Sequence, residues 1–108
     1  MFIIIAPMNT HEKHHIRLHV NNIVCYYAEI FNQTRYAPKY NIVFQLTSPF
    51  KLPNGDFEKK PTNTKYLLSV RDGNIELNFN NLEDLMEQLN KFDDIMIKCQ
   101  KMKEILNG

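Results

Sequence analysis

The sequence predicts an α+β fold: an antiparallel β-meander of about five strands with a long C-terminal amphipathic helix packed on one face. Residues 1–80 alternate short β-forming runs with turns rich in Asn, Pro and Gly, which is typical of a sheet and its loops. Residues 81–106 instead repeat apolar side chains every three or four positions, the period of a helix. A chain of 108 residues buries about two thirds of its unfolded surface, so we expect one domain spanning 1–108.

The N-terminal strands are predicted from apolar runs and from alternation. Met1–Met8 (MFIIIAPM) is continuously apolar and is expected to form a buried first strand. In His15–Val20 apolar and polar residues alternate, as in a half-buried strand. The Asn pair at 21–22 then predicts a two-residue hairpin turn into a strand at Ile23–Phe31, because Asn tolerates positive φ.

The later strands are bounded by turn residues. Asn41–Thr47 is a further predicted strand, and Ser48–Thr64, with three prolines, is expected to be a long loop. Tyr66–Val70 and Ile75–Phe79 flank an Asp-Gly pair, which is the strongest short hairpin signal in the chain.

The helix signal covers the last quarter of the chain. Asn81 followed three positions later by Asp84 resembles a capping box. A break is expected at Asp93-Asp94, with Asp94 capping a second segment from Ile95. The apolar stripe consists of Leu82, Leu85, Met86, Leu89, Phe92, Met96, Cys99, Met102 and Leu106.

The net charge of +1 conceals two opposed segments. Arg35–Arg71 holds seven basic residues against two acidic ones, a net charge of +5, whereas Leu82–Asp94 holds five acidic residues against one lysine, a net charge of −4. Aromatic residues interleave with the basic segment, as in proteins that bind single strands by stacking bases. The alternative is that Phe44 and Tyr66 belong to the core and that the lysines lie on a solvated loop. The candidate nucleic-acid-binding residues are Arg35, Lys39, Phe57, Lys59, Lys60, Lys65 and Arg71.

Catalysis and metal binding have little support. The chain lacks a Gly-rich phosphate loop, a nucleophile elbow and an HExxH motif, so we expect no enzyme, no cofactor and no catalytic residue. On the predicted strand His15 and His19 would stand about 13 Å apart, too far to share one ion. The expected role of the four histidines is a polar, partly solvated strand face, with no metal site. They are His11, His14, His15 and His19.

The two cysteines predict a reducing, cytoplasmic location. Cys25 and Cys99 are isolated thiols among apolar neighbours, so we expect each to pack as a small hydrophobic side chain. Met1–Met8 is too short for a secretory or membrane segment, and no membrane association is expected.

The C-terminal third resembles a known family. Ile75-x-Leu77-Asn78, Leu82, Leu85, Glu87-Gln88-Leu89 and Phe92-Asp93-Asp94 are similar to the last strand and helix of the transcriptional coactivator positive cofactor four, and Leu52–Phe57 with Lys59 and Pro61 is similar to a turn between its later strands. Members bind single-stranded DNA or RNA on a concave sheet face and dimerise through their helices. The resemblance implies that role for Lys59, Lys60, Lys65, Phe44 and Phe57.

Two hypotheses of function follow. The first is a small non-enzymatic binding protein that takes single-stranded DNA or RNA on its basic and aromatic residues and forms a homodimer through the C-terminal helix. The second is a protein-binding module of the phage or mobile-element type, an inhibitor, adaptor or small structural subunit that acts through that helix. The stripe of this helix is wide, because it includes the apolar residues Ile95, Ile97, Met102 and Ile105.

Overall fold

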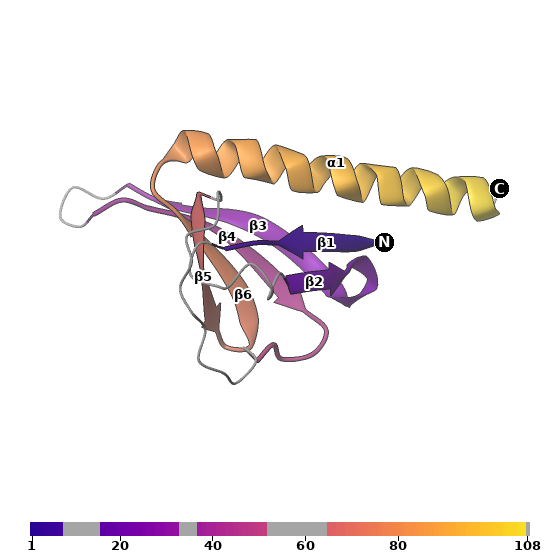
Figure 1. The fold of residues 1–108 in the computed structure, drawn as a ribbon, viewed down its shortest axis with the longest axis horizontal. Helices are drawn as coiled ribbons and strands as arrows, with labels where there is room; N and C mark the ends of the chain where they lie inside the picture. The colour runs from indigo at the N-terminus through magenta and orange to yellow at the C-terminus, as the bar shows by residue number, and fades with distance from the viewer. Residues whose placement is uncertain (8–15, 33–36, 52–64, 108) are drawn as a thin grey trace.

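The computed structural model of the chain describes residues 1–7, 16–32, 37–51 and 65–107 (Figure 1). Within them the strands form two antiparallel sheets, a two-stranded sheet of order β1-β2 and a four-stranded sheet of order β3-β4-β6-β5. One long helix follows, so the α+β class is confirmed. The elements are β1 (Phe2–Ile5), β2 (Ile16–His19), the 3-10 turn η2 (Val20–Asn22), β3 (Ile23–Phe31), β4 (Lys39–Leu46), β5 (Tyr66–Arg71), β6 (Asn74–Phe79) and α1 (Leu82–Asn107).

The strand order differs from a simple meander in one place, because β4 pairs with β6 and not with β5. Burial explains the difference. β6 buries three alternate side chains, Ile75, Leu77 and Phe79, and therefore takes a central position. β5 exposes Leu67 and Val70 and lies at the edge.

The hairpin predicted at Asn21-Asn22 is wrong. Val20–Asn22 forms the 3-10 turn η2, β2 pairs with β1, and β3 pairs with β4. Val20 is buried, and its amide donates to the carbonyl of Met1 (3.1 Å). Burying Val20 turns the chain inward, so that it passes from one sheet to the other instead of folding back.

The hairpin predicted between β5 and β6 is confirmed. Asp72 (φ 54°) and Gly73 (φ 78°) both have the positive φ that a type I′ turn requires, and Arg71 pairs with Asn74 across it. The Phe50 amide donates to the Gly73 carbonyl (2.7 Å), which ties the chain after β4 to this turn.

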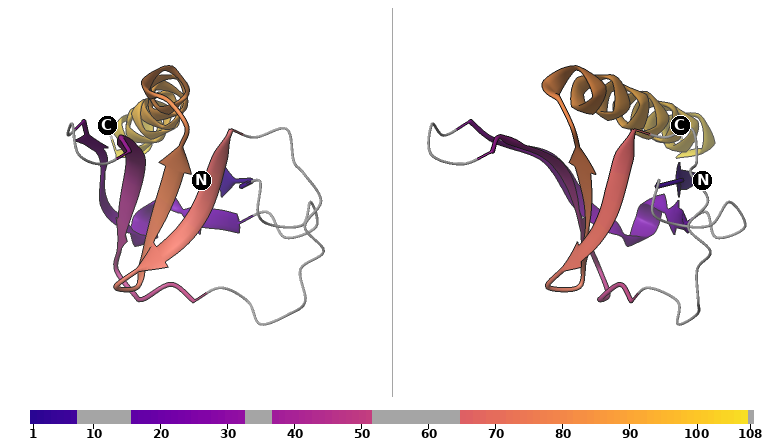
Figure 2. Two further views of the ribbon diagram at one scale, coloured as in Figure 1. Left: turned by 90° about the vertical axis from the view of Figure 1, so that its left-hand side faces the viewer. Right: turned by 60° about the vertical axis from the view of Figure 1, so that its left-hand side comes forward.

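The core lies between one face of the four-stranded sheet and a cover made of α1 and the β1-β2 sheet, which lie on the same side (Figure 2). β1 alternates exposed and buried side chains, so the first strand is half-buried rather than buried on both faces. The Phe92 ring of α1 meets the Phe44 ring of β4 edge to face, with centroids 5.1 Å apart. This pair fixes the helix on the sheet.

The N-cap at Asn81 follows the prediction, the reciprocal bond to Asp84 comes from the Asn81 side chain instead of its backbone amide, and the predicted break does not occur. The Asp84 amide donates to Asn81 Oδ1 (2.8 Å), and Asn81 Nδ2 donates to Asp84 Oδ2 (3.1 Å). α1 then continues without interruption from Leu82 to Asn107. Asp94, the expected cap of a second segment, lies inside this helix, and the neighbouring Asp93 carboxylate accepts a hydrogen bond from the Tyr26 hydroxyl of β3 (2.5 Å).

Candidate functional site

Three of the seven candidate nucleic-acid-binding residues lie in the described part of the chain. Lys65 Nζ pairs with Asp84 (3.3 Å) of α1 on the helix side, and Arg71 pairs with Glu29 (3.0 Å) on the opposite, open face of the sheet. Lys39 is exposed at the first position of β4. Lys65 and Arg71 therefore do not converge on one surface. The remaining candidates, Arg35, Phe57, Lys59 and Lys60, lie outside the described residues.

Two aromatic residues of the basic segment, Phe44 and Tyr66, lie in the core, and Tyr40 and Phe50 pack against it partly buried. Phe44 is fully buried and Tyr66 nearly so, and the Tyr66 hydroxyl accepts a hydrogen bond from the Ala6 amide (3.0 Å). Phe44 therefore cannot stack on a base, so the role that the resemblance implies for it is wrong. Its burial agrees with the alternative expectation that Phe44 and Tyr66 are core residues.

On the open face of the sheet Arg71 forms ion pairs with two carboxylates. The Arg71 guanidinium contacts Glu29 and also Glu76 (3.2 Å), so two acids surround one base. The hydrogen bond from Arg71 holds the pKa of Glu29 below its ordinary value of 4.5, with smaller contributions from Asn41 and Lys39. No sequence signal indicates this cluster, because Arg71 and Glu29 are 42 positions apart.

The Glu29 pKa predicts a pH dependence of stability. Because folding lowers this pKa, the ionised carboxylate stabilises the fold above pH 4.5, and the contribution is lost as the pH falls through the lower folded value. Between about pH 5 and pH 3 the free energy of unfolding should therefore fall less in Arg71→Gln than in the wild type. Urea denaturation at both pH values measures this. The control is Lys39→Gln, which removes one charge near Glu29 but no hydrogen bond, and an equal effect of the two variants would contradict the prediction.

The apolar stripe of α1 extends beyond the surface that covers it. Successive positions seven residues apart share one helix face, and their exposed fractions are 0% for Leu85, 1% for Phe92 and 9% for Cys99, but 81% for Leu106. Every residue from 100 to 106 is exposed, and we call this segment the overhang. Figure 1 shows it as the end of α1 on the side away from β5.

Element lengths explain the overhang. A helix of 26 residues is about 39 Å long at 1.5 Å per residue. The longest strand, β3, has nine residues and spans only about 30 Å. Because α1 begins above the end of β6, its last turns have no strand beneath them in the described structure (Figure 1).

The overhang combines three exposed apolar side chains with lysines. Met102, Ile105 and Leu106 are 54%, 80% and 81% exposed. Around them the helix carries exposed lysines and one exposed carboxylate, and no ion pair to these lysines occurs among the described residues. The charged residues are Lys98, Lys101, Lys103 and Glu104.

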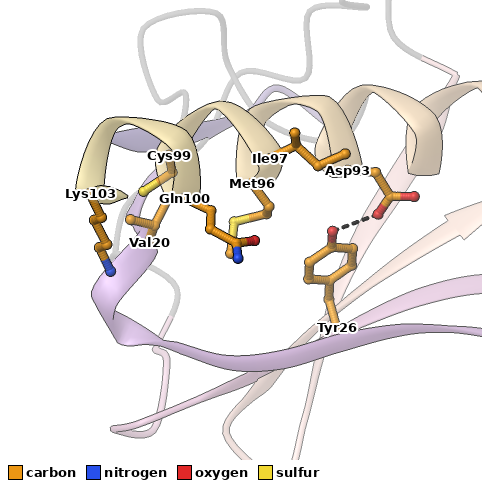
Figure 3. Close-up of a pocket in the computed structure, with 8 residues that line it drawn as sticks. All are labelled: Val20, Tyr26, Asp93, Met96, Ile97, Cys99, Gln100 and Lys103. Carbon is orange, nitrogen blue, oxygen red and sulfur yellow. Dashed lines mark hydrogen bonds between the residues drawn. The ribbon is translucent and has the colours of Figure 1, made fainter. Parts of the chain in front are cut away.

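A groove runs along the base of the overhang, between α1 and the chain from η2 into β3 (Figure 3). Its volume is about 400 Å³. The Tyr26–Asp93 hydrogen bond marks one end, and burial together with this bond raises the pKa of Tyr26. The side chains of Val20, Met96, Ile97, Cys99, Gln100 and Lys103 complete the lining.

The two cysteines differ in burial. Cys99 is buried as predicted and faces the groove. The prediction for Cys25 is wrong: its thiol is exposed on β3 and donates to Gln45 Oε1 (3.1 Å). The alternation of β3 turns Cys25 to the open face of the sheet, which neither α1 nor the β1-β2 sheet covers.

The described residues contain no group of His, Cys, Asp and Glu that could hold a metal ion. His19 contacts the Phe2 ring edge to face, and its Nδ1 accepts from the Asn21 amide (3.1 Å). His11, His14 and His15 lie outside the described residues. None of the helices described has the length and hydropathy of a membrane-spanning segment.

Comparison of the chain with protein-family models, curated proteins and solved structures gives no match in any of the three. The resemblance to the positive cofactor four family therefore stays a prediction.

Proposed function

We propose that this chain is a non-enzymatic protein-binding module that uses the overhang of α1. One observation carries the proposal: the stripe that is buried at Leu85, Phe92 and Cys99 continues to Leu106, where it is 81% exposed. Apolar side chains that share one helix face normally pack against another surface. In the described chain that surface ends before the last turns.

The energetics require more than the apolar contact. Burying Met102, Ile105 and Leu106 contributes about 1.5–3 kcal/mol each at full burial. Association costs about 4–15 kcal/mol in lost translational and rotational freedom, so the apolar contact of these three side chains is not sufficient by itself. The groove beside Cys99 adds a concave surface for one partner side chain, which increases the contact without a change in the fold.

The charges around the overhang select the partner. Lys98, Lys101 and Lys103 present three cations against the single carboxylate of Glu104. Complementary charge at the rim of an interface increases the association rate and excludes wrong partners. The partner that fits is therefore a protein surface with an apolar centre and an acidic rim.

A double variant, Met102→Asp with Ile105→Asp, tests this proposal. It should abolish partner binding, because carboxylates would then lie at the centre of the apolar contact. Met86→Asp is the matched control, since Met86 lies on the same helix, 43% exposed against 54% for Met102, but outside the overhang. The measurement is quantitative mass spectrometry of proteins that co-purify with each form from the native host.

A partner retained equally by all three forms would contradict the proposal, as would the absence of any partner specific to the wild type. Circular dichroism confirms that each variant folds. The acidic rim predicts in addition that raising the salt concentration slows association of the captured partner.

Binding of single-stranded nucleic acid is the competing proposal, and a salt titration separates the two. Anisotropy of a labelled oligonucleotide at low salt measures the affinity where phosphate neutralisation is strongest. Tight binding that Lys39→Ala weakens, and that the Met102→Asp, Ile105→Asp variant leaves unchanged, would favour nucleic acid. The ion pairs of Lys65 and Arg71 are the reason we place this function second.

A further inference from the structure

We propose that β3 pairs with the β3 strand of a second copy of this chain. The pairing is antiparallel about a two-fold axis at Tyr27, and it joins two four-stranded sheets into one continuous sheet of eight strands. The inference is independent of the proposed function, because the interface is the β3 edge of the four-stranded sheet and includes no residue of the overhang.

The first support is the position of β3 in the sheet. In the order β3-β4-β6-β5 it is an edge strand, and only β4 pairs with it among the described residues. The β4 pairing is regular from Cys25 to Phe31, with its one irregularity between Ile23 and Cys25. The other side of β3 therefore presents a long row of backbone amides and carbonyls.

The second support is the composition of β3. Natural edge strands usually carry lysines, prolines or bulges along their length, which prevent pairing with another chain. β3 reads IVCYYAEIF, with one charged residue and no proline, and its one irregularity lies at the N-terminal end, between Ile23 and Cys25. Its exposed large apolar side chains are Val24, Tyr27, Ile30 and Phe31. The other edge strand, β5, is shorter and has Lys65 before it and Arg71 as its last residue.

The third support identifies the occupant as a second copy. An antiparallel two-fold axis at Tyr27 sets Val24 of each copy opposite Ile30 of the other, and Tyr27 opposite its own symmetry mate, and all three side chains are exposed. Exposed apolar side chains then cover one another, as an isologous interface requires. Glu29 comes opposite Cys25, so the two Glu29 carboxylates stay about 13 Å apart along the strands and do not repel at close range.

Sedimentation equilibrium of the wild type and of two variants tests the proposal. The wild type should be dimeric, and Val24→Lys with Ile30→Lys should raise the dissociation constant by at least about tenfold, because two symmetry-related apolar pairs are lost. Leu67→Lys is the matched control on β5, with 45% exposure against 47% for Ile30, and it should remain dimeric. A monomeric wild type, or a dimer that only Leu67→Lys dissociates, would overturn the inference.

A cross-linking experiment tests the register. In a Cys25→Ser background, Tyr27→Cys puts two thiols opposite each other at the axis, where paired Cα atoms lie about 4.5–5.5 Å apart, within disulfide range. Oxidation should give a covalent dimer, whereas Ser69→Cys in the same background, on β5, should stay monomeric on a denaturing gel. Equal cross-linking of both would refute pairing through β3.

The two proposals fail separately. The Val24→Lys, Ile30→Lys variant should retain the partner bound by the overhang, and the Met102→Asp, Ile105→Asp variant should remain dimeric. Loss of the dimer in the overhang variant would place the interface on α1 and would contradict the pairing through β3.

Discussion

Replacing Phe92 with alanine should lower the free energy of unfolding by about 3–5 kcal/mol, because it removes a buried ring and leaves a cavity. The Phe92 ring is 1% exposed and meets the Phe44 ring of the central strand β4. A domain of this size has roughly 5–15 kcal/mol of stability in total, so this single change removes a large part of it. Urea denaturation followed by circular dichroism measures the loss.

Leu106→Ala is the matched control for this substitution. It lies on the same stripe two heptads later, and because it is 81% exposed its effect should be within about 0.5 kcal/mol. A loss at Leu106 comparable to that at Phe92 would show that the overhang is covered in the free protein, and it would contradict the proposed binding surface.

Gly73→Ala should have the next largest effect, a loss of about 1–3 kcal/mol from the forced positive φ alone. A Cβ atom at this position would also lie 2.9 Å from Cβ and 3.0 Å from Cα of Pro49. The contact with the Pro49 backbone is not relieved by a side-chain rotation, so either the turn or the Pro49–Phe50 segment must shift. Thermal unfolding of the variant should give a lower midpoint.

Asp72→Gly is the control for the turn. Asp72 also has positive φ, so glycine relieves its backbone strain while it increases the entropy of the unfolded chain, and the two effects oppose each other. We expect a change of less than about 1 kcal/mol. A larger loss at Asp72 than at Gly73 would mean that the close approach to Pro49 contributes little to stability.

Local signals in the sequence predict the elements that depend only on neighbouring residues. The Asp-Gly turn needs two residues with positive φ, and the capping of α1 needs Asn81 and Asp84 three positions apart. Both are confirmed, and the tertiary contacts made there, from Phe50 to Gly73 and from Lys65 to Asp84, are compatible with the local structure. The turn at Asn21-Asn22 has an equally good local signal, but the burial of Val20 opposes it, and the fold follows the burial.

The surfaces depend on contacts that are distant in sequence. The stripe of α1 is predictable from its period, but the overhang appears only when the helix length is compared with the strands beneath it. The pairing of Arg71 with Glu29 requires the order β3-β4-β6-β5, which no local pattern encodes. For the same reason the charge of the Arg35–Arg71 segment does not reveal that Lys65 and Arg71 lie on different faces of the sheet.

The length of α1 has a consequence for the dynamics of the free protein. Helices without tertiary contact are marginal in water, so the turns of the overhang should open and close far more often than the turns that hold Phe92. Their backbone amides should exchange hydrogen with solvent within seconds, while those around Leu85 and Phe92 stay protected. Binding of a partner to the overhang then orders these turns, and the binding contacts must offset the conformational entropy that is lost. This cost weakens the affinity and lets the partner dissociate quickly.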